Sequence, residues 1–183
     1  MSYRNGNYCA FYVENPSNQS NLAEHATKDF VYYNQLRMWK GKDSSFPFID
    51  SHNKNYNVCD DSDWKNTLKP RLRERIRNSK NIILILSSIT KNSIPLKEEI
   101  DYGINVQELP VIVIYPDFKT KDDLLEKFNL VRSLWNNLPI FRDSMHKVPT
   151  LHIPHNKELI IKALNNRNFT VNNKCKEDIY YFK

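Results

Sequence analysis

The sequence predicts an α/β fold of the flavodoxin-like, doubly wound kind, with about five parallel strands and helices on both faces of the sheet. Strand-type and helix-type segments alternate along the chain, and two of the strand-type segments, residues 81–87 and 110–115, are almost continuously apolar. A strand without polar alternation is typical of the centre of a parallel sheet that is covered on both faces.

The chain begins with a strand, a helix and a second strand. Residues 7–14 are rich in aromatic and β-branched side chains and run into a polar loop, which indicates a strand. A helix is expected over 29–40, ending near Gly41. Residues 46–51 predict a short strand, and Pro47 favours an edge position for it, because proline cannot donate a hydrogen bond to a neighbouring strand.

A long polar loop over residues 52–63 leads into the next helix, which the aspartates at the end of the loop are expected to cap. Apolar side chains recur every four residues from Trp64 to Ile76. Pro70 interrupts this pattern and either kinks the helix or marks its first turn. The apolar strand 81–87 follows.

In the second half, Pro95 is well placed as the first residue of a short helix over 95–104. The remaining elements alternate in type: a strand at 110–115, a helix at 121–136, a strand at 148–153 and a helix at 157–164. The last residues, 166–183, form a polar tail that is expected to be loosely attached, so the domain is assigned to residues 1–165.

Composition favours one globular domain with a hydrophobic core, since 40% of the 183 residues are hydrophobic and 26% are charged. No aliphatic run is long enough to span a membrane, and the N-terminus lacks the apolar stretch of a signal peptide, so we expect a cytosolic protein. The three cysteines, Cys9, Cys59 and Cys175, are widely spaced and are expected to be reduced thiols.

Glycine is scarce, with only Gly6, Gly41 and Gly103 in the whole chain. A phosphate-binding P-loop or a dinucleotide-binding Rossmann turn needs several glycines close together, so that the backbone can approach phosphate. Any nucleotide must therefore be held by other groups.

Glu99 is the leading candidate for a catalytic residue. At about 100° per residue, the helix over 95–104 places Leu96 and Ile100 on its apolar face and Glu98 on the opposite, solvated face. Glu99 falls on the apolar side, where a carboxylate is costly unless it has a partner or a chemical role. Two interpretations remain open at this point: a catalytic acid, or one half of a structural ion pair.

Five segments of the chain have a distinctive sequence: A-F-Y-V-E-N at 10–15, D-S-D-W-K-N-T-L-K at 61–69, N-I-I-L-I-L-S-S at 81–88, P-L-K-E-E-I-D-Y-G-I at 95–104 and L-P-V-I-V-I-Y at 109–115. Together they resemble TIR-like domains of the Thoeris ThsB type, over roughly residues 7–116. In that family the glutamate of a W-V-x-x-E-I pattern cleaves NAD, and Glu99-Ile100 occupies its place. The resemblance thus implies a TIR-like fold and a catalytic role for Glu99.

The resemblance also implies an anti-phage function. NAD would be the substrate and no further cofactor is expected; cleavage would release nicotinamide and make a cyclic or derivatised ADP-ribose signal for a downstream effector protein. Self-assembly into a homo-oligomer is a further expectation. A catalytically silent TIR-like module that senses or scaffolds is the alternative.

The nucleotide is expected at the carboxyl ends of the first and third strands, where doubly wound folds bind their ligands. The residues that end neighbouring strands there are Phe11, Tyr12, Asp50, Ser87 and Ser88. The two serines could donate hydrogen bonds to ribose or phosphate.

The chain departs from the family pattern at two places that concern base stacking. Pro95-Leu96 replaces the Trp-Val pair, and Val13 stands where many relatives carry an aromatic residue. Tyr12 or Trp64 could supply the stacking surface instead.

Other candidate sites are interpreted as structural. Asp50-Ser51-His52 contains the residue types of a catalytic triad but lacks a nucleophile elbow. His152 and His155 are separated by Pro154 and have no further ligands near them in sequence, so no metal site is expected. The basic residues between 69 and 77 scatter around a helix, and we do not expect a nucleic-acid surface.

Overall fold

Five parallel strands form a single sheet in the computed structural model, which describes residues 4–13, 28–52 and 63–181. The strands lie side by side in chain order: β1 (Gly6–Ala10), β2 (Ser79–Ile85), β3 (Val111–Tyr115), β4 (Thr150–Pro154) and β5 (Ile179–Tyr181). The predicted α/β class with a parallel sheet is confirmed.

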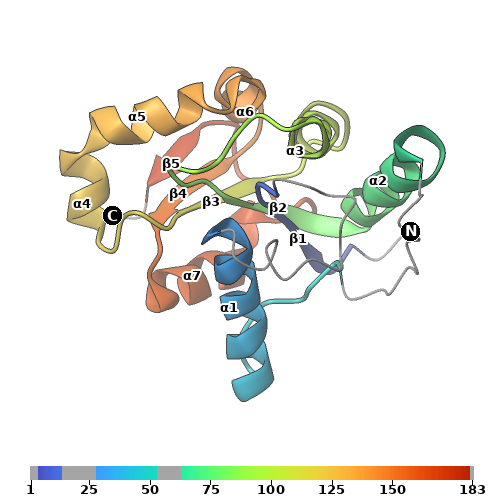
Figure 1. Cartoon of the computed structure of the whole chain (residues 1–183). Coiled ribbons are helices and arrows are strands. Elements are labelled where there is room, and N and C mark those ends of the chain that lie inside the picture. Colours follow the sequence, from blue (N-terminus) through green and yellow to red (C-terminus); the bar gives the residue numbers. More distant parts are fainter. Residues whose placement is uncertain (1–3, 14–27, 53–62, 182–183) are drawn as a thin grey trace.

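Helices cover both faces of the sheet (Figure 1). One face carries α1 (Lys28–Lys42) and α7 (Lys157–Asn165). The other carries α2 (Lys69–Arg77), α3 (Ile94–Ile100), α4 (Lys121–Glu126), α5 (Phe128–Asn136) and α6 (Pro139–Ser144). Within β2, Ile82 and Leu84 pack under the second group of helices while Ile83 and Ile85 pack under the first. Burial on both faces explains why residues 82–85 of β2 and every position of β3 are apolar.

The strand expected over residues 46–51 does not form, and this prediction was wrong. Only one bridge joins the segment to β1, between Asn7 and Asp50, although Phe46 and Phe48 are buried as the alternation requires. Pro47 has no N–H to donate, and the Asn7 side chain accepts the Ile49 N–H at 2.8 Å in place of a second strand partner. The segment still lies outside β1, so the chain reverses its direction of winding at β1.

The C-terminal segment is not a loose tail. Residues 179–181 form β5, which pairs with β4, and Phe169 is buried in the core beside α7. The Val171 N–H donates to the Lys80 carbonyl, and the Asn81 side chain donates to the Phe169 carbonyl. The fifth strand of the sheet therefore comes from a segment that composition alone marks as polar and unstructured.

Pro70 lies in the first turn of α2, as one of the two predicted alternatives requires. The preceding turn, η2 (Trp64–Leu68), is π-helical, because the Lys69 N–H donates to the Trp64 carbonyl five residues back. Asp63 caps this turn by accepting the Lys65 N–H. Most of the loop expected over 52–63, with Cys59, lies outside the described residues.

In the second half of the chain the predicted helix over 121–136 is two helices, since the backbone leaves the helical region at Lys127. The short helix α6 has no counterpart among the predictions. Within the described ranges, no helix combines the length and the apolar character that crossing a bilayer demands.

The helix that carries Glu99 starts at Ile94, one residue before the predicted start at Pro95. Ser93 caps α3 by accepting the Leu96 N–H, and Pro95 occupies the first turn. A π-helical stretch, η3 (Asp101–Val106), continues α3 without a break. Gly103 lets this stretch lie close to β2, because a side chain there would collide with Ile82. The helical segment one turn after Glu99 therefore lies close to the sheet.

Candidate functional site

A cavity of about 100 Å³ lies at the carboxyl end of β1, between the residues that follow this strand, the start of α3 and His52. It is lined by Cys9, Phe11, Val13, His52, Ser93, Pro95 and Glu99. This is the region where the winding of the chain reverses and where the ligand of a doubly wound fold is expected.

Glu99 is half-buried and is held by the sheet. The Tyr8 hydroxyl, from β1, donates a hydrogen bond of 2.8 Å to Glu99 Oε1. Burial raises the pKa of Glu99 to about 8, while the Tyr8 hydrogen bond and the positive charge of Arg75 act in the opposite direction. In the protein alone the carboxyl is therefore mostly protonated at neutral pH, and a cation in the cavity would favour its ionised form.

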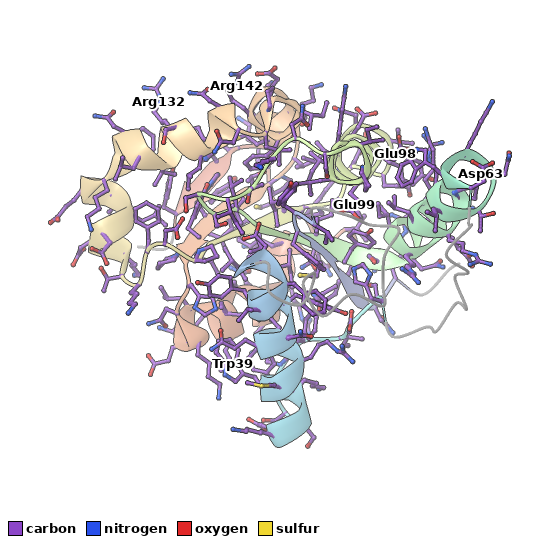
Figure 2. All side chains as sticks on the ribbon, viewed as in Figure 1. Trp39, Asp63, Glu98, Glu99, Arg132 and Arg142 are labelled. Atoms are coloured by element: carbon purple, nitrogen blue, oxygen red, sulfur yellow. The ribbon has the colours of Figure 1, made fainter. Side chains whose placement is uncertain are left out.

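Glu98 and Glu99 leave α3 in different directions, Glu98 toward α2 and Glu99 toward the sheet (Figure 2). Glu98 was expected to be solvated, and this was wrong. Its side chain is only 14% exposed and forms ion pairs with Arg73 at 2.7 Å and Lys69 at 3.0 Å. The structural ion pair considered for Glu99 is thus made by its neighbour.

His52 packs against Tyr8 and the end of β1. Its ring lies 4.7 Å from the Tyr8 ring, and its Nε2 lies 2.9 Å from the Cys9 carbonyl oxygen. The His52 backbone N–H donates to Asp50 Oδ1 at 2.9 Å. Burial lowers the pKa of His52, and the nearby Asp50 carboxylate only partly opposes this, so the ring is neutral at pH 7.

Asp50 contacts residues around the cavity without lining the cavity itself. Its Oδ2 accepts a 2.7 Å hydrogen bond from the Tyr33 hydroxyl and lies 3.8 Å from Arg37 Nε. These contacts, together with the His52 N–H, occupy the carboxylate. Asp50 does not line the cavity, contrary to the prediction; it positions the backbone of His52.

Of the three aromatic residues expected at the nucleotide site, Phe11, Tyr12 and Trp64, only Phe11 lines the cavity. Its ring is stacked on Tyr33 with 5.0 Å between ring centroids, which fixes its orientation. Tyr12 is buried in the core on the α3 side of the sheet, and Trp64 packs on the same core from η2. The structure brings neither of them to the cavity.

The two serines after β2 serve the loop that leads to α3. Ser87 is fully buried and its hydroxyl donates to Asp29 Oδ1 at 2.5 Å, while the Thr90 hydroxyl donates to Asp29 Oδ2 at 3.0 Å. Ser88 is exposed, and its backbone N–H donates to Asp117 at 2.7 Å. The Ser87 hydroxyl therefore binds a residue of α1. It does not face the cavity, although it had been expected to line the nucleotide site.

Several cavity residues were missed by sequence reasoning. Cys9, Phe11 and Val13 are alternate residues, so their side chains lie on one side of the chain at the end of β1. Since Phe11 was predicted to line the site, this alternation could also have predicted Cys9 and Val13. His52 was noticed as a triad-type residue and interpreted as structural. The Tyr8–Glu99 contact has no sequence signal, because it depends on how α3 is placed over β1.

The groups that line the cavity suit an interaction with a positively charged carbon or ring. It combines one carboxyl group and one neutral imidazole with a mainly apolar lining, which strengthens electrostatic interactions inside it. Across the described part of the chain, no three side chains of histidine, cysteine, aspartate or glutamate gather closely enough to hold a metal ion.

Comparison with protein families gives one match relevant to this site. The model described as "Thoeris protein ThsB, TIR-like domain" matches residues 8–121. The matched range runs from Tyr8 in β1 to the start of α4 and contains every residue that lines the cavity. More than half of the chain is covered.

Proposed function

Since this chain belongs to the family of Thoeris ThsB TIR-like domains, which act in anti-phage defence, we propose that it cleaves NAD at the bond between ribose and nicotinamide. The products would be nicotinamide and a cyclic or derivatised ADP-ribose that signals to a downstream effector protein. The observation that carries this proposal is the position of Glu99, in the cavity at the end of β1 and hydrogen-bonded to Tyr8.

One carboxylate is sufficient for this reaction. Nicotinamide leaves NAD as a neutral base from a positively charged pyridinium, so no general acid is needed, in contrast to ordinary glycoside hydrolysis with its two carboxyl groups. An anion near the ribose C1 stabilises the oxocarbenium-like transition state. Glu99 is the carboxyl group that lines this cavity.

The charge state of Glu99 suits a cationic substrate. With its pKa raised to about 8 by burial, the carboxyl holds a proton in the protein alone at pH 7. A pyridinium ring nearby would stabilise the carboxylate, since an opposite charge at short range lowers the pKa of a carboxyl group. Substrate binding would thus expel the proton and produce the anion that the transition state needs.

The size of the cavity limits how much of NAD it can hold. Sites for whole drug-sized ligands usually enclose about 300–1,000 Å³, whereas this cavity measures about 100 Å³. It therefore suits the nicotinamide ring, with Phe11 as the aromatic wall. The adenosine half would lie outside it.

The test is to incubate the purified protein with NAD and to measure free nicotinamide by chromatography, with and without extract from phage-infected cells. The proposal predicts nicotinamide in at least the stimulated sample, together with an ADP-ribose derivative of matching amount. No nicotinamide under either condition would contradict it and favour a silent sensing or scaffolding module.

A further inference from the structure

Resting on the proposed cleavage of NAD, we propose that His52 is a second catalytic residue of this cavity, which accepts the proton of the nucleophile that replaces nicotinamide at the ribose carbon. The proposal starts from position. His52 and Glu99 line the same small cavity although they come from different parts of the chain, and the Tyr8 side chain contacts both of them.

The contact with Cys9 fixes the tautomer of His52. A backbone carbonyl oxygen can only accept a hydrogen bond, so Nε2, at 2.9 Å from the Cys9 oxygen, carries the proton. In a neutral ring the lone pair is then on Nδ1. A neutral imidazole with a defined lone pair is the form that a general base requires.

The structure holds the imidazole in place from several sides. Asp50 accepts the His52 backbone N–H, and Tyr33 donates to Asp50. The rings of Tyr8 and Tyr33 contact the imidazole, with centroids at 4.7 and 5.7 Å. The charged and titratable groups around it come from every neighbouring element: Tyr8 and Cys9 of β1, Tyr33 and Arg37 of α1, Arg75 of α2, Glu99 of α3, and Asp50. These contacts fix the orientation of the imidazole ring.

The proposed step balances as follows. The bond between the ribose C1 and the pyridinium nitrogen breaks, and its electron pair stays on nicotinamide, which leaves neutral. A hydroxyl group, of water or of the substrate itself, forms a new C–O bond at that carbon and loses its proton. His52 Nδ1 takes this proton and later releases it to solvent.

The two residues would divide the work. Glu99 must remain an anion while positive charge develops on the ribose, so it cannot take the proton of the nucleophile at the same moment without losing that role. A neutral base beside it removes this conflict. This division explains why a carboxyl and an imidazole share one cavity.

The decisive variant is His52→Gln. The glutamine amide can still donate to the Cys9 carbonyl, but it cannot accept a proton. The matched control is His155→Gln, because His155 packs against Tyr32 and Trp39, with ring centroids at 4.8 and 5.8 Å, and does not line the cavity.

The measurement is nicotinamide release from NAD by the wild type and both variants, in buffer and in buffer with azide, a nucleophile that has no proton to lose. We expect His52→Gln to lose about 100-fold or more in buffer and to recover much of this loss with azide, as typical contributions of a general base suggest. His155→Gln should match the wild type. Wild-type rates in the His52 variant, or a loss that azide does not relieve, would overturn the proposal.

A wild-type measurement covers the case of a His52 variant that does not fold. Proton transfer to His52 predicts a solvent deuterium isotope effect on the reaction in buffer that disappears with azide. An isotope effect equal in both, or absent from both, would contradict the role of His52. The wild-type rate by itself tests NAD cleavage, so a wild type that releases no nicotinamide, with or without extract from phage-infected cells, refutes the proposed function. An active wild type with an unaffected variant refutes only this inference.

Discussion

Tyr8 of β1 donates its hydroxyl to Glu99 of α3 at 2.8 Å, and this contact joins the strand to the helix at the edge of the cavity. Tyr8 is almost completely buried, so its hydroxyl has exchanged water for the carboxyl group. The bond favours the carboxylate, while burial of Glu99 favours the protonated form and prevails. The balance between these two effects sets the charge of the proposed catalytic group.

The first prediction concerns stability and pH. The pKa of Glu99 is raised from its ordinary value of 4.5 to about 8, so between these values the folded state binds a proton that the unfolded state has lost. The free energy of unfolding contributed by Glu99 therefore falls as pH rises through this window, by at most about 1.4 kcal/mol per pH unit. Urea unfolding at several pH values should show this decline in the wild type but a smaller one in Glu99→Gln.

Other titrating groups, including the buried Asp29, whose pKa burial also raises, are common to both proteins and cancel in the comparison. Parallel stability curves for the wild type and Glu99→Gln would show that Glu99 ionises normally.

Tyr8→Phe should move the pH dependence of catalysis. Without the hydroxyl, the carboxylate of Glu99 loses its donor and the pKa of Glu99 rises further. The rise of the NAD cleavage rate with pH should then shift to higher pH, with the alkaline plateau less affected than the rate at neutral pH. Tyr102→Phe is the matched control, because the Tyr102 hydroxyl accepts a hydrogen bond from Gln107, just after η3, and does not reach the cavity. An unshifted profile in Tyr8→Phe would mean that Tyr8 does not tune Glu99.

The orientation of Glu99 was predictable from the sequence because helical periodicity is a local property. Leu96 and Ile100 are both buried, as the predicted apolar face requires, and Glu99 lies beside them. The apolar runs of β2 and β3 were predictable for the same reason, since a strand buried on both faces needs no information from distant residues.

Contacts between segments that are distant in the sequence could not be predicted from local sequence patterns. The fate of Glu98 depends on Arg73 and Lys69, and these residues meet it only because α2 and α3 pack side by side. The same holds for Ser87, which Asp29 reaches from a different helix. Residues 179–181 form a strand because they pair with the edge of β4. The polar sequence of the C-terminal segment does not predict this pairing.

Glu98→Gln should lower stability and leave NAD cleavage nearly unchanged. The substitution removes the ion pairs with Arg73 and Lys69, which are partly exposed, so we expect a loss of about 1 kcal/mol or less. The loss should shrink at high salt, because exposed charges are screened. Thermal unfolding of the wild type and the variant at low and high salt is the measurement, and a loss independent of salt would show that the pairs are not its cause.

Self-assembly is a further prediction, based on family membership and on a cavity too small for a whole dinucleotide. A second copy could supply the missing wall, and turnover would then rise faster than linearly with enzyme concentration. Specific activity across a wide dilution series, measured together with sedimentation, decides the matter. A monomer with constant specific activity would show that one copy completes its own site.

The most direct test of Glu99 as the catalytic residue compares two neighbouring substitutions in one assay. Nicotinamide release from NAD is measured for the wild type, Glu99→Gln and Glu98→Gln, with folding checked by thermal unfolding. Because only Glu99 lines the cavity, we expect Glu99→Gln to lose about 100-fold or more, as for other charge-stabilising groups, and Glu98→Gln to stay near the wild-type rate. Equal rates in the two folded variants would contradict the assignment of Glu99.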